Sequence, residues 1–198
     1  MTVALAALLL GALLGALLAG CGPADTEVDE TPAVADDKAN TAPAPWEPRP
    51  CPGGEILQAD PTGTLQSIRP GCFDQAVAEA ITEFPEPLPP GTEWRIRTPD
   101  FADPQEHMPV ILDGNQDVMV AEYWLCAWMD SYLQAVDSND APGQAAGMAH
   151  LSRYTQLPAI QANHANPEVF ETTVIGPAKE NDPTNLRAHF KSCSNYLH

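Results

Sequence analysis

Basic residues are scarce in this chain of 198 residues, where nine Lys and Arg stand against 27 Asp and Glu and the formal net charge is −18. Residues 51–198 alone carry 20 of the acids and seven of the basic residues. Proteins that bind DNA or RNA need clustered Lys and Arg to neutralise phosphates. The composition therefore argues against a nucleic-acid partner, whereas acidity of this kind keeps an exported protein soluble.

Signatures of catalytic and metal sites are also missing. The chain has no Gly-x-Ser-x-Gly, no His-Glu-x-x-His, no phosphate-binding glycine loop and no dinucleotide fingerprint. It has no Cys-x-x-Cys either, and no two of its five His residues have zinc-ligand spacing. We therefore expect a protein that is not an enzyme and that holds neither a metal ion nor another cofactor.

One segment has the beginning of a calcium-binding loop. Asp113, Asn115 and Asp117 place oxygen atoms at its first, third and fifth positions. The pattern then fails, because Val118 stands where the loop needs Gly and Trp124 where it needs Glu. Short polar side chains also cap helices, so we interpret this segment as a helix start.

A long uncharged run opens the chain and ends at Leu18-Ala19-Gly20-Cys21. This ending resembles the lipobox of bacterial lipoproteins, and the resemblance covers the first 21 residues. It implies that residues 1–20 are a cleaved signal peptide and that Cys21 is lipidated. It also implies a lipid-anchored protein at the extracytoplasmic face of the cell membrane, because the two acyl chains of such a lipid form a stable anchor.

An uncleaved membrane span is the alternative, since about 20 apolar residues suffice to cross a bilayer. The small residues Ala19 and Gly20 favour cleavage, and Gly22-Pro23 continues a helix poorly. No Lys or Arg precedes the apolar run, although a signal peptide ordinarily begins with a basic segment. We therefore expect the natural start to lie upstream of Met1.

Residues 21–50 are predicted to form the lipidated cysteine and a disordered tether. From residue 22 onward the segment holds six Pro and seven acids against two basic residues. A segment of this composition cannot bury enough apolar surface to offset the entropy lost on ordering. It spans about 30 Å as a relaxed coil and about 90 Å when stretched.

The remaining residues, 51–198, have the length of one domain with a single core. With the lipidated cysteine set aside, they contain Cys51, Cys72, Cys126 and Cys193. An even number in an oxidising compartment predicts two disulfides, for which three pairings are possible. We favour Cys51–Cys72, which closes a short loop around two predicted strands, and Cys126–Cys193, which joins two predicted helices.

Hydrophobic periodicity predicts short strands first and helices later. Residues 55–58 and 64–68 form a predicted hairpin around a Pro-Thr-Gly turn, and residues 94–97 and 108–112 are further strands. Apolar residues at helical spacing predict helices at residues 73–84, 117–136, 140–157 and 182–197. The second of these is apolar nearly all round, which is typical of a buried central helix. The expected fold class is α+β: a small single disulfide-bonded domain, helix-rich in its C-terminal half, behind the disordered tether.

Three sets of side chains suggest binding or catalysis. Arg95 and Arg97 share one face of a predicted strand, where paired guanidinium groups can hold a carboxylate or phosphate ligand. The alternative is that they pair with the protein's own acids.

His150 and His164, with Glu168 or Glu171, form a loose set for general acid–base chemistry. Such a set also arises by chance in most domains. The aromatic set Trp94, Trp124, Trp128 and Tyr132 could bind glycans if exposed, but aromatics at helical spacing normally bury in the core.

The sequence thus predicts an exported, lipid-anchored envelope lipoprotein whose domain binds an envelope protein or a cell-wall component. Two alternatives stay open: a small anionic-ligand-binding protein that uses Arg95 and Arg97, and a hydrolase with a His/carboxylate site. A cleft floored by the two arginines favours the first, and a pocket with a His hydrogen-bonded to a carboxylate favours the second. A flat apolar patch favours the protein-binding role.

Overall fold

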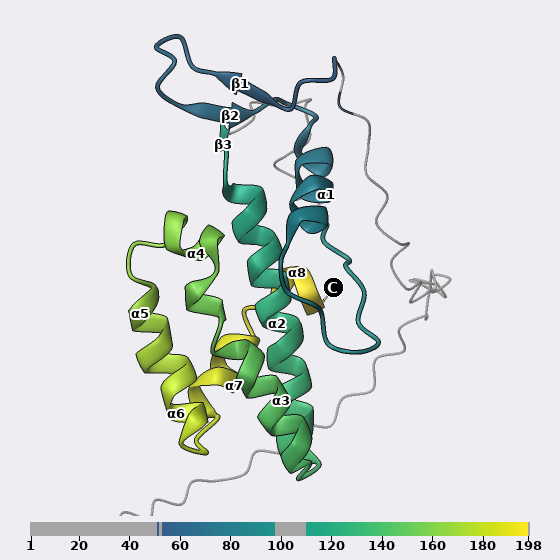
Figure 1. Cartoon of the computed structure of the whole chain (residues 1–198), viewed down its shortest axis with the longest axis vertical. Coiled ribbons are helices and arrows are strands. Elements are labelled where there is room, and N and C mark those ends of the chain that lie inside the picture. The colour runs from purple at the N-terminus through teal and green to yellow at the C-terminus, as the bar shows by residue number, and fades with distance from the viewer. Residues whose placement is uncertain (1–50, 52, 98–109, 198) are drawn as a thin grey trace, which may run out of the picture. The chain divides into compact units, whose positions relative to one another are not determined.

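The computed structural model describes Cys51, residues 53–97 and residues 110–197 (Figure 1). All of these belong to one unit of the chain, Ala42–His198. The predicted signal peptide, Cys21 and the predicted tether lie outside the described residues. Within the described part of the chain, no helix combines the length and the apolar character needed to cross a membrane.

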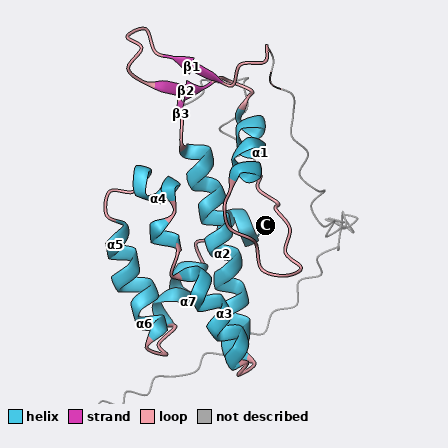
Figure 2. Ribbon diagram, viewed as in Figure 1, coloured by secondary structure: helices cyan, strands magenta, loops and turns pink. Residues whose placement is uncertain are grey.

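A small antiparallel sheet forms from strands β1 (Leu57–Ala59), β2 (Gln66–Ile68) and β3 (Ile111–Leu112), in the order β1-β2-β3 (Figure 2). Ile68 lies opposite Leu57 on one side and Ile111 on the other, so these apolar side chains share one face and pack into the core. The predicted hairpin is confirmed. Of the predicted strand 108–112, the structure describes residues 110–112, and β3 lies within them.

The turn of the hairpin is organised by Asp60. Its carboxylate accepts hydrogen bonds from the Thr62 hydroxyl, from the Thr64 backbone N–H at 2.7 Å and from the Leu65 backbone N–H at 2.9 Å. These bonds, that of Thr62 first, lower the pKa of Asp60 to about 2. Since hydrogen bonds to a carboxylate favour its charged form, the turn is tied to the ionisation of this one side chain.

We predict that an NMR titration of the Asp60 carboxyl carbon has its midpoint near 2, as the lowered pKa requires. Because the folded-state pKa lies below that of an unfolded Asp, about 3.9, the carboxylate stabilises the hairpin above about pH 4 and loses this effect as the pH falls through the folded value. Thr62→Val removes the strongest of the bonds and should raise the midpoint. An unchanged midpoint in that variant would contradict the role of Thr62.

Helix α1 (Phe73–Glu83) and helix α2 (Asn115–Asp137) follow the periodicity of their apolar residues. The prediction of a buried central helix is confirmed, because α2 packs against α1, α3, α4, α7 and α8. The indole N–H groups of Trp124 and Trp128 both donate to the carbonyl oxygen of Pro87, at 2.8 and 3.0 Å. These two tryptophans and Tyr132 are buried, so they form part of the core and not an exposed glycan platform.

Helix α3 (Ala141–Leu151) runs against α2 at unusually close range. A Cβ atom on Gly147 would lie 2.9 Å from the Tyr132 Cβ and 3.2 Å from its Cα. Glycine is therefore the residue that allows this approach of the two helices. The predicted helix 140–157 is shorter in the structure, because α3 ends at Leu151 and the 3₁₀ turn η2 (Tyr154–Gln156) follows.

The rest of the chain folds into short helical pieces, which are α4 (Pro158–Asn163), α5 (Pro167–Phe170), the π-helical turn η3 (Glu171–Ile175), α6 (Gly176–Lys179), α7 (Thr184–Phe190) and α8 (Ser194–Leu197). Periodicity did not predict α4, α5 and α6, since these helices are short and begin at or next to a proline. The predicted helix 182–197 is in fact two helices. The break between them contains Cys193, which is 4% exposed.

The predicted strand at residues 94–97 is wrong, because this segment joins no strand in the described part of the chain. The alternation itself holds: Ile96 is 1% exposed, Trp94 packs against the core, and Arg95 and Arg97 are exposed. Alternating residues specify which side chains point inward. They do not specify whether the backbone finds a partner strand.

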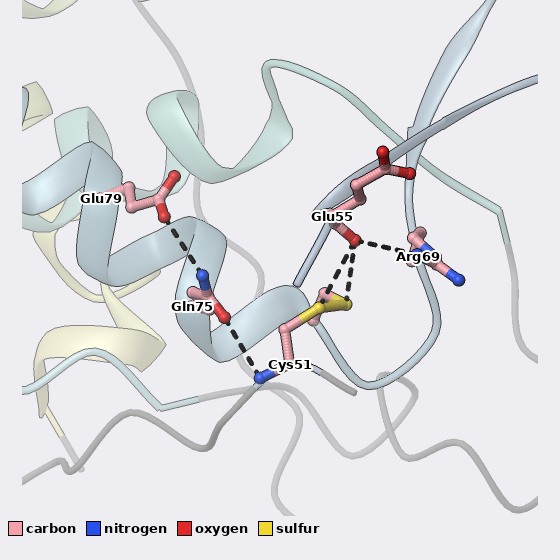
Figure 3. The surroundings of a disulfide bond; sticks show 6 residues. Cys51, Glu55, Arg69, Gln75 and Glu79 are labelled. Atoms are coloured by element: carbon pink, nitrogen blue, oxygen red, sulfur yellow. Dashed lines mark hydrogen bonds between the residues drawn. A yellow bond between two sulfur atoms is a disulfide. The ribbon is translucent and has the colours of Figure 1, made fainter. Parts of the chain in front are cut away.

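The disulfides join the two pairs that the sequence favoured. Cys51 pairs with Cys72 at a Cα–Cα distance of 4.5 Å, and Cys126 pairs with Cys193 at 5.8 Å. Figure 3 shows that the first is further tied to α1, because the Cys51 backbone N–H donates to the side-chain oxygen of Gln75 at 3.1 Å. The second disulfide attaches the C-terminal segment to the central helix.

Candidate functional site

The two arginines proposed for anion binding lie in a segment that joins no strand among the described residues. Arg95 is exposed and its guanidinium lies 3.3 Å from the Glu93 carboxylate, so it pairs with one of the protein's own acids. Arg97 is also exposed. Neither arginine lines any of the three hollows described below.

The structure also separates the predicted histidine–carboxylate set. The ring of His150 stacks on Trp128 with centroids 3.8 Å apart, and its Nδ1 lies 3.7 Å from the Glu86 carboxylate. Burial lowers the pKa of His150, and the nearby Glu86 opposes this only in part. Glu171 instead pairs with Lys179 at 2.5 Å. His150 is therefore a packed side chain beside Trp128 and Glu86, whereas His164 lines a different hollow, described below.

Two adjoining hollows of about 630 and 640 Å³ form what we call the acidic groove. The first lies between the end of α1, the start of α2 and α4, and the second continues along α1 toward β1. The groove is lined by five carboxylate side chains, Glu55, Glu79, Glu83, Asp113 and Asp117. No Lys, Arg or His occurs among its described lining residues.

The carboxylates of the acidic groove repel one another. Burial raises the pKa of Asp117, and the charges of Asp113 and Glu83 raise it further. The Gln116 side-chain amide donates to Asp113 at 2.9 Å and to Asp117 at 3.1 Å, which relieves part of the repulsion. A positively charged group in the groove would relieve the rest, because an opposite charge nearby favours the ionised carboxylates.

Part of the groove lining is apolar. Phe84 and Pro85 at the end of α1 line the first hollow together with Leu157, Pro158 and Ala162 from the region of α4. Such a lining offers buried apolar contact area beside charged groups that orient what binds. The groove is thus suited to a ligand with both apolar and cationic parts.

The segment that opens like a calcium loop shapes the start of α2. The Gly114 backbone N–H donates to the Asp113 carboxylate at 3.0 Å, and the Asn115 side chain donates to the Leu112 carbonyl at 2.8 Å. These bonds hold the turn before the helix, although no side chain caps the helix N–H groups directly. Among the residues with assigned positions, no three His, Cys, Asp or Glu side chains are arranged to hold a metal ion.

A smaller hollow of about 200 Å³, the C-terminal pocket, lies beside the Cys126–Cys193 disulfide. Its walls come from α2, η2, the end of α4, α7 and α8. Its titratable groups are Glu122, Tyr123, Tyr154, His164, His189 and Tyr196. The sequence indicated His164 as a candidate site residue but not Glu122 or His189, because no local pattern connects residues this far apart in the chain.

No family model matches this chain, and no curated protein or solved structure matches it either. A function must therefore be inferred from the geometry and charge of the described residues. Of the hollows described, the acidic groove has the greater volume and the more one-sided charge.

Proposed function

We propose that this protein is an exported, lipid-anchored envelope lipoprotein whose domain binds a basic segment of another envelope protein in the acidic groove. The observation that carries the proposal is the lining of the groove, which combines apolar residues with five carboxylates and includes no basic residue in the part described. Binding is proposed in preference to catalysis because no His or other basic residue lines the groove to act with its carboxylates.

Size and charge support a peptide segment as the occupant. Hollows of 630 and 640 Å³ fall within the usual range of binding pockets, about 300 to 1,000 Å³. Apolar contact with Phe84 and Leu157 would provide affinity. Lys or Arg side chains of the partner would pair with Glu83 and Asp117, and this complementarity raises the association rate and selects against acidic partners.

The predicted anchor explains where such a partner would be found. A lipid on Cys21 and a tether of residues 22–50 keep the domain within about 90 Å of the membrane surface. A basic segment carried by a neighbouring envelope protein then binds at a high effective concentration.

The proposal is tested with a fluorescent octapeptide that contains four lysines and one phenylalanine, and with its glutamate counterpart. Fluorescence anisotropy with the full-length protein in non-ionic detergent should show saturable binding of the lysine peptide only. Glu83→Gln/Asp117→Asn should weaken this binding about tenfold, because two charge pairs are lost, one of them with the half-buried Asp117. Detergent micelles without protein provide the blank.

A matched control separates the groove from net charge. Glu168→Gln/Glu180→Gln changes the net charge by the same amount at exposed positions that do not line the groove. We expect this variant to change the affinity less than about twofold, as surface charges contribute little. Equal weakening by both double variants, or equal binding of the glutamate peptide, would show that the groove is not the site.

A further inference from the structure

The C-terminal pocket is assembled from separate segments and is separate from the acidic groove. Glu122 comes from α2, Tyr154 from η2, His164 from the end of α4 and His189 from α7. The Cys126–Cys193 disulfide lines the same pocket and joins α2 to the turn before α8. The disulfide thus fixes two of the pocket walls to each other.

Tyr154 lines this pocket with a hydroxyl that lacks a partner. The residue is 4% exposed, and its ring is held edge-on by Phe170, with the centroids 5.1 Å apart. The other three described tyrosine hydroxyls each donate a hydrogen bond, Tyr123 to Glu93, Tyr132 to Ala178 and Tyr196 to Asp130.

No bond of this kind joins the Tyr154 hydroxyl to any residue whose position is described. The hydroxyl oxygen is not among the fully buried atoms that lack a partner, so it reaches the hollow that Tyr154 lines. It is therefore available to hydrogen-bond a polar group that enters the pocket from outside the protein.

The charges that line the pocket determine which kind of ligand group it can bind. Although part of the Glu122 side chain is exposed, burial of its carboxyl raises the pKa, and the charge of His164 opposes this only in part. No Lys or Arg lines the pocket among the described residues. Burial also lowers the pKa of His189, so this imidazole is neutral at pH 7 and can accept a hydrogen bond.

The pocket thus offers four kinds of group that bind ammonium ions: a carboxylate, a neutral imidazole, a phenol and aromatic ring faces. An anion would meet the Glu122 carboxylate with no Lys or Arg on the described walls to compensate it. We infer that the C-terminal pocket binds a small primary ammonium compound, with its nitrogen placed between the Glu122 carboxylate and the Tyr154 hydroxyl. A volume of about 200 Å³ restricts the ligand to a molecule such as an amino sugar or a short alkyl diamine.

Isothermal titration calorimetry of the full-length protein in non-ionic detergent tests this inference. The probes are glucosamine, 1,4-diaminobutane and glucose, which has the size of the first without its ammonium group. At least one amine should bind saturably and glucose should not. Preference for glucosamine identifies an amino sugar as the source of the ammonium group, and preference for the diamine identifies an alkyl amine.

Variants assign the binding to the pocket. Glu122→Gln should weaken amine binding about tenfold or more, since a charge-assisted hydrogen bond is lost. Tyr154→Phe should weaken it severalfold and leave the melting temperature unchanged, because the oxygen removed has no partner in the described protein. Glu180→Gln, an exposed position outside the pocket, should leave the affinity unchanged.

The groove variant Glu83→Gln/Asp117→Asn must also leave amine binding unchanged, which separates this site from the proposed protein-binding function. The inference is overturned if neither amine binds at millimolar concentration or if glucose binds as well as glucosamine. It is also overturned if Glu122→Gln binds amines as the wild type does.

Discussion

Replacing Cys21 with Ala is expected to move the protein from the membrane fraction to the soluble fraction and to abolish labelling by an alkyne-tagged fatty acid. The expectation rests on the sequence, because residues 1–50 lie outside the described structure. Lipidation requires the thiol, and each buried methylene of an acyl chain contributes about 0.8 kcal/mol to membrane binding. Without the lipid, little holds the protein at the membrane, since an acidic domain is repelled by anionic lipids.

Fractionation and labelling of whole cells measure both effects at once. Cys51→Ala provides the matched control, because it removes a cysteine of the domain and should keep the fatty-acid label. The competing model makes a different prediction. If the Cys21→Ala protein stays in the membrane with residues 1–20 still attached, the apolar run is a transmembrane anchor and the lipoprotein assignment is wrong.

Loss of the Cys126–Cys193 disulfide is expected to lower the free energy of unfolding by about 4 kcal/mol in the chain-entropy model. The cysteines are 67 residues apart in the chain, so the bond strongly restricts the unfolded state. A domain is stable by only about 5 to 15 kcal/mol, and the loss is therefore a large part of the total. Urea denaturation of Cys126→Ala/Cys193→Ala measures it by linear extrapolation.

The other disulfide supplies the comparison. Cys51 and Cys72 are 21 residues apart, and the same model predicts a smaller loss of about 3 kcal/mol for Cys51→Ala/Cys72→Ala. Native protein should resist alkylation of all four cysteines until it is reduced. Alkylation of two or more of them before reduction would contradict the disulfide scheme.

Local periodicity was sufficient to predict the elements whose residues form their own pattern. The hairpin around Asp60, helix α1 and helix α2 follow from alternation, from helical spacing and from the proline after α1. The breaks were harder to predict. Nothing in residues 182–197 shows that the helix stops at Phe190, because the position of Cys193 in that break depends on its partner, Cys126, in another helix.

The candidate sites were only partly visible in the sequence. Asp113 and Asp117 belong to a short polar motif, and this motif predicted their place at the start of α2. The motif did not predict that they lie near Glu83. That residue ends a helix some 30 positions earlier and lies near them only because α1 packs against α2. Arg95 and Arg97 were the more conspicuous pair, yet they line none of the hollows described.

The amino-acid sequence alone determined the features that depend on composition or on neighbouring residues. These are the lipobox resemblance, the acidic balance, the even number of cysteines in the domain, and the faces that α1 and α2 bury. Tertiary structure alone decided which acids share the groove and that Glu122, Tyr154 and His189 surround one pocket. The physical reason is that the acidic groove and the C-terminal pocket form where helices from distant parts of the chain pack together. Packing between distant segments leaves no periodic signal along the chain.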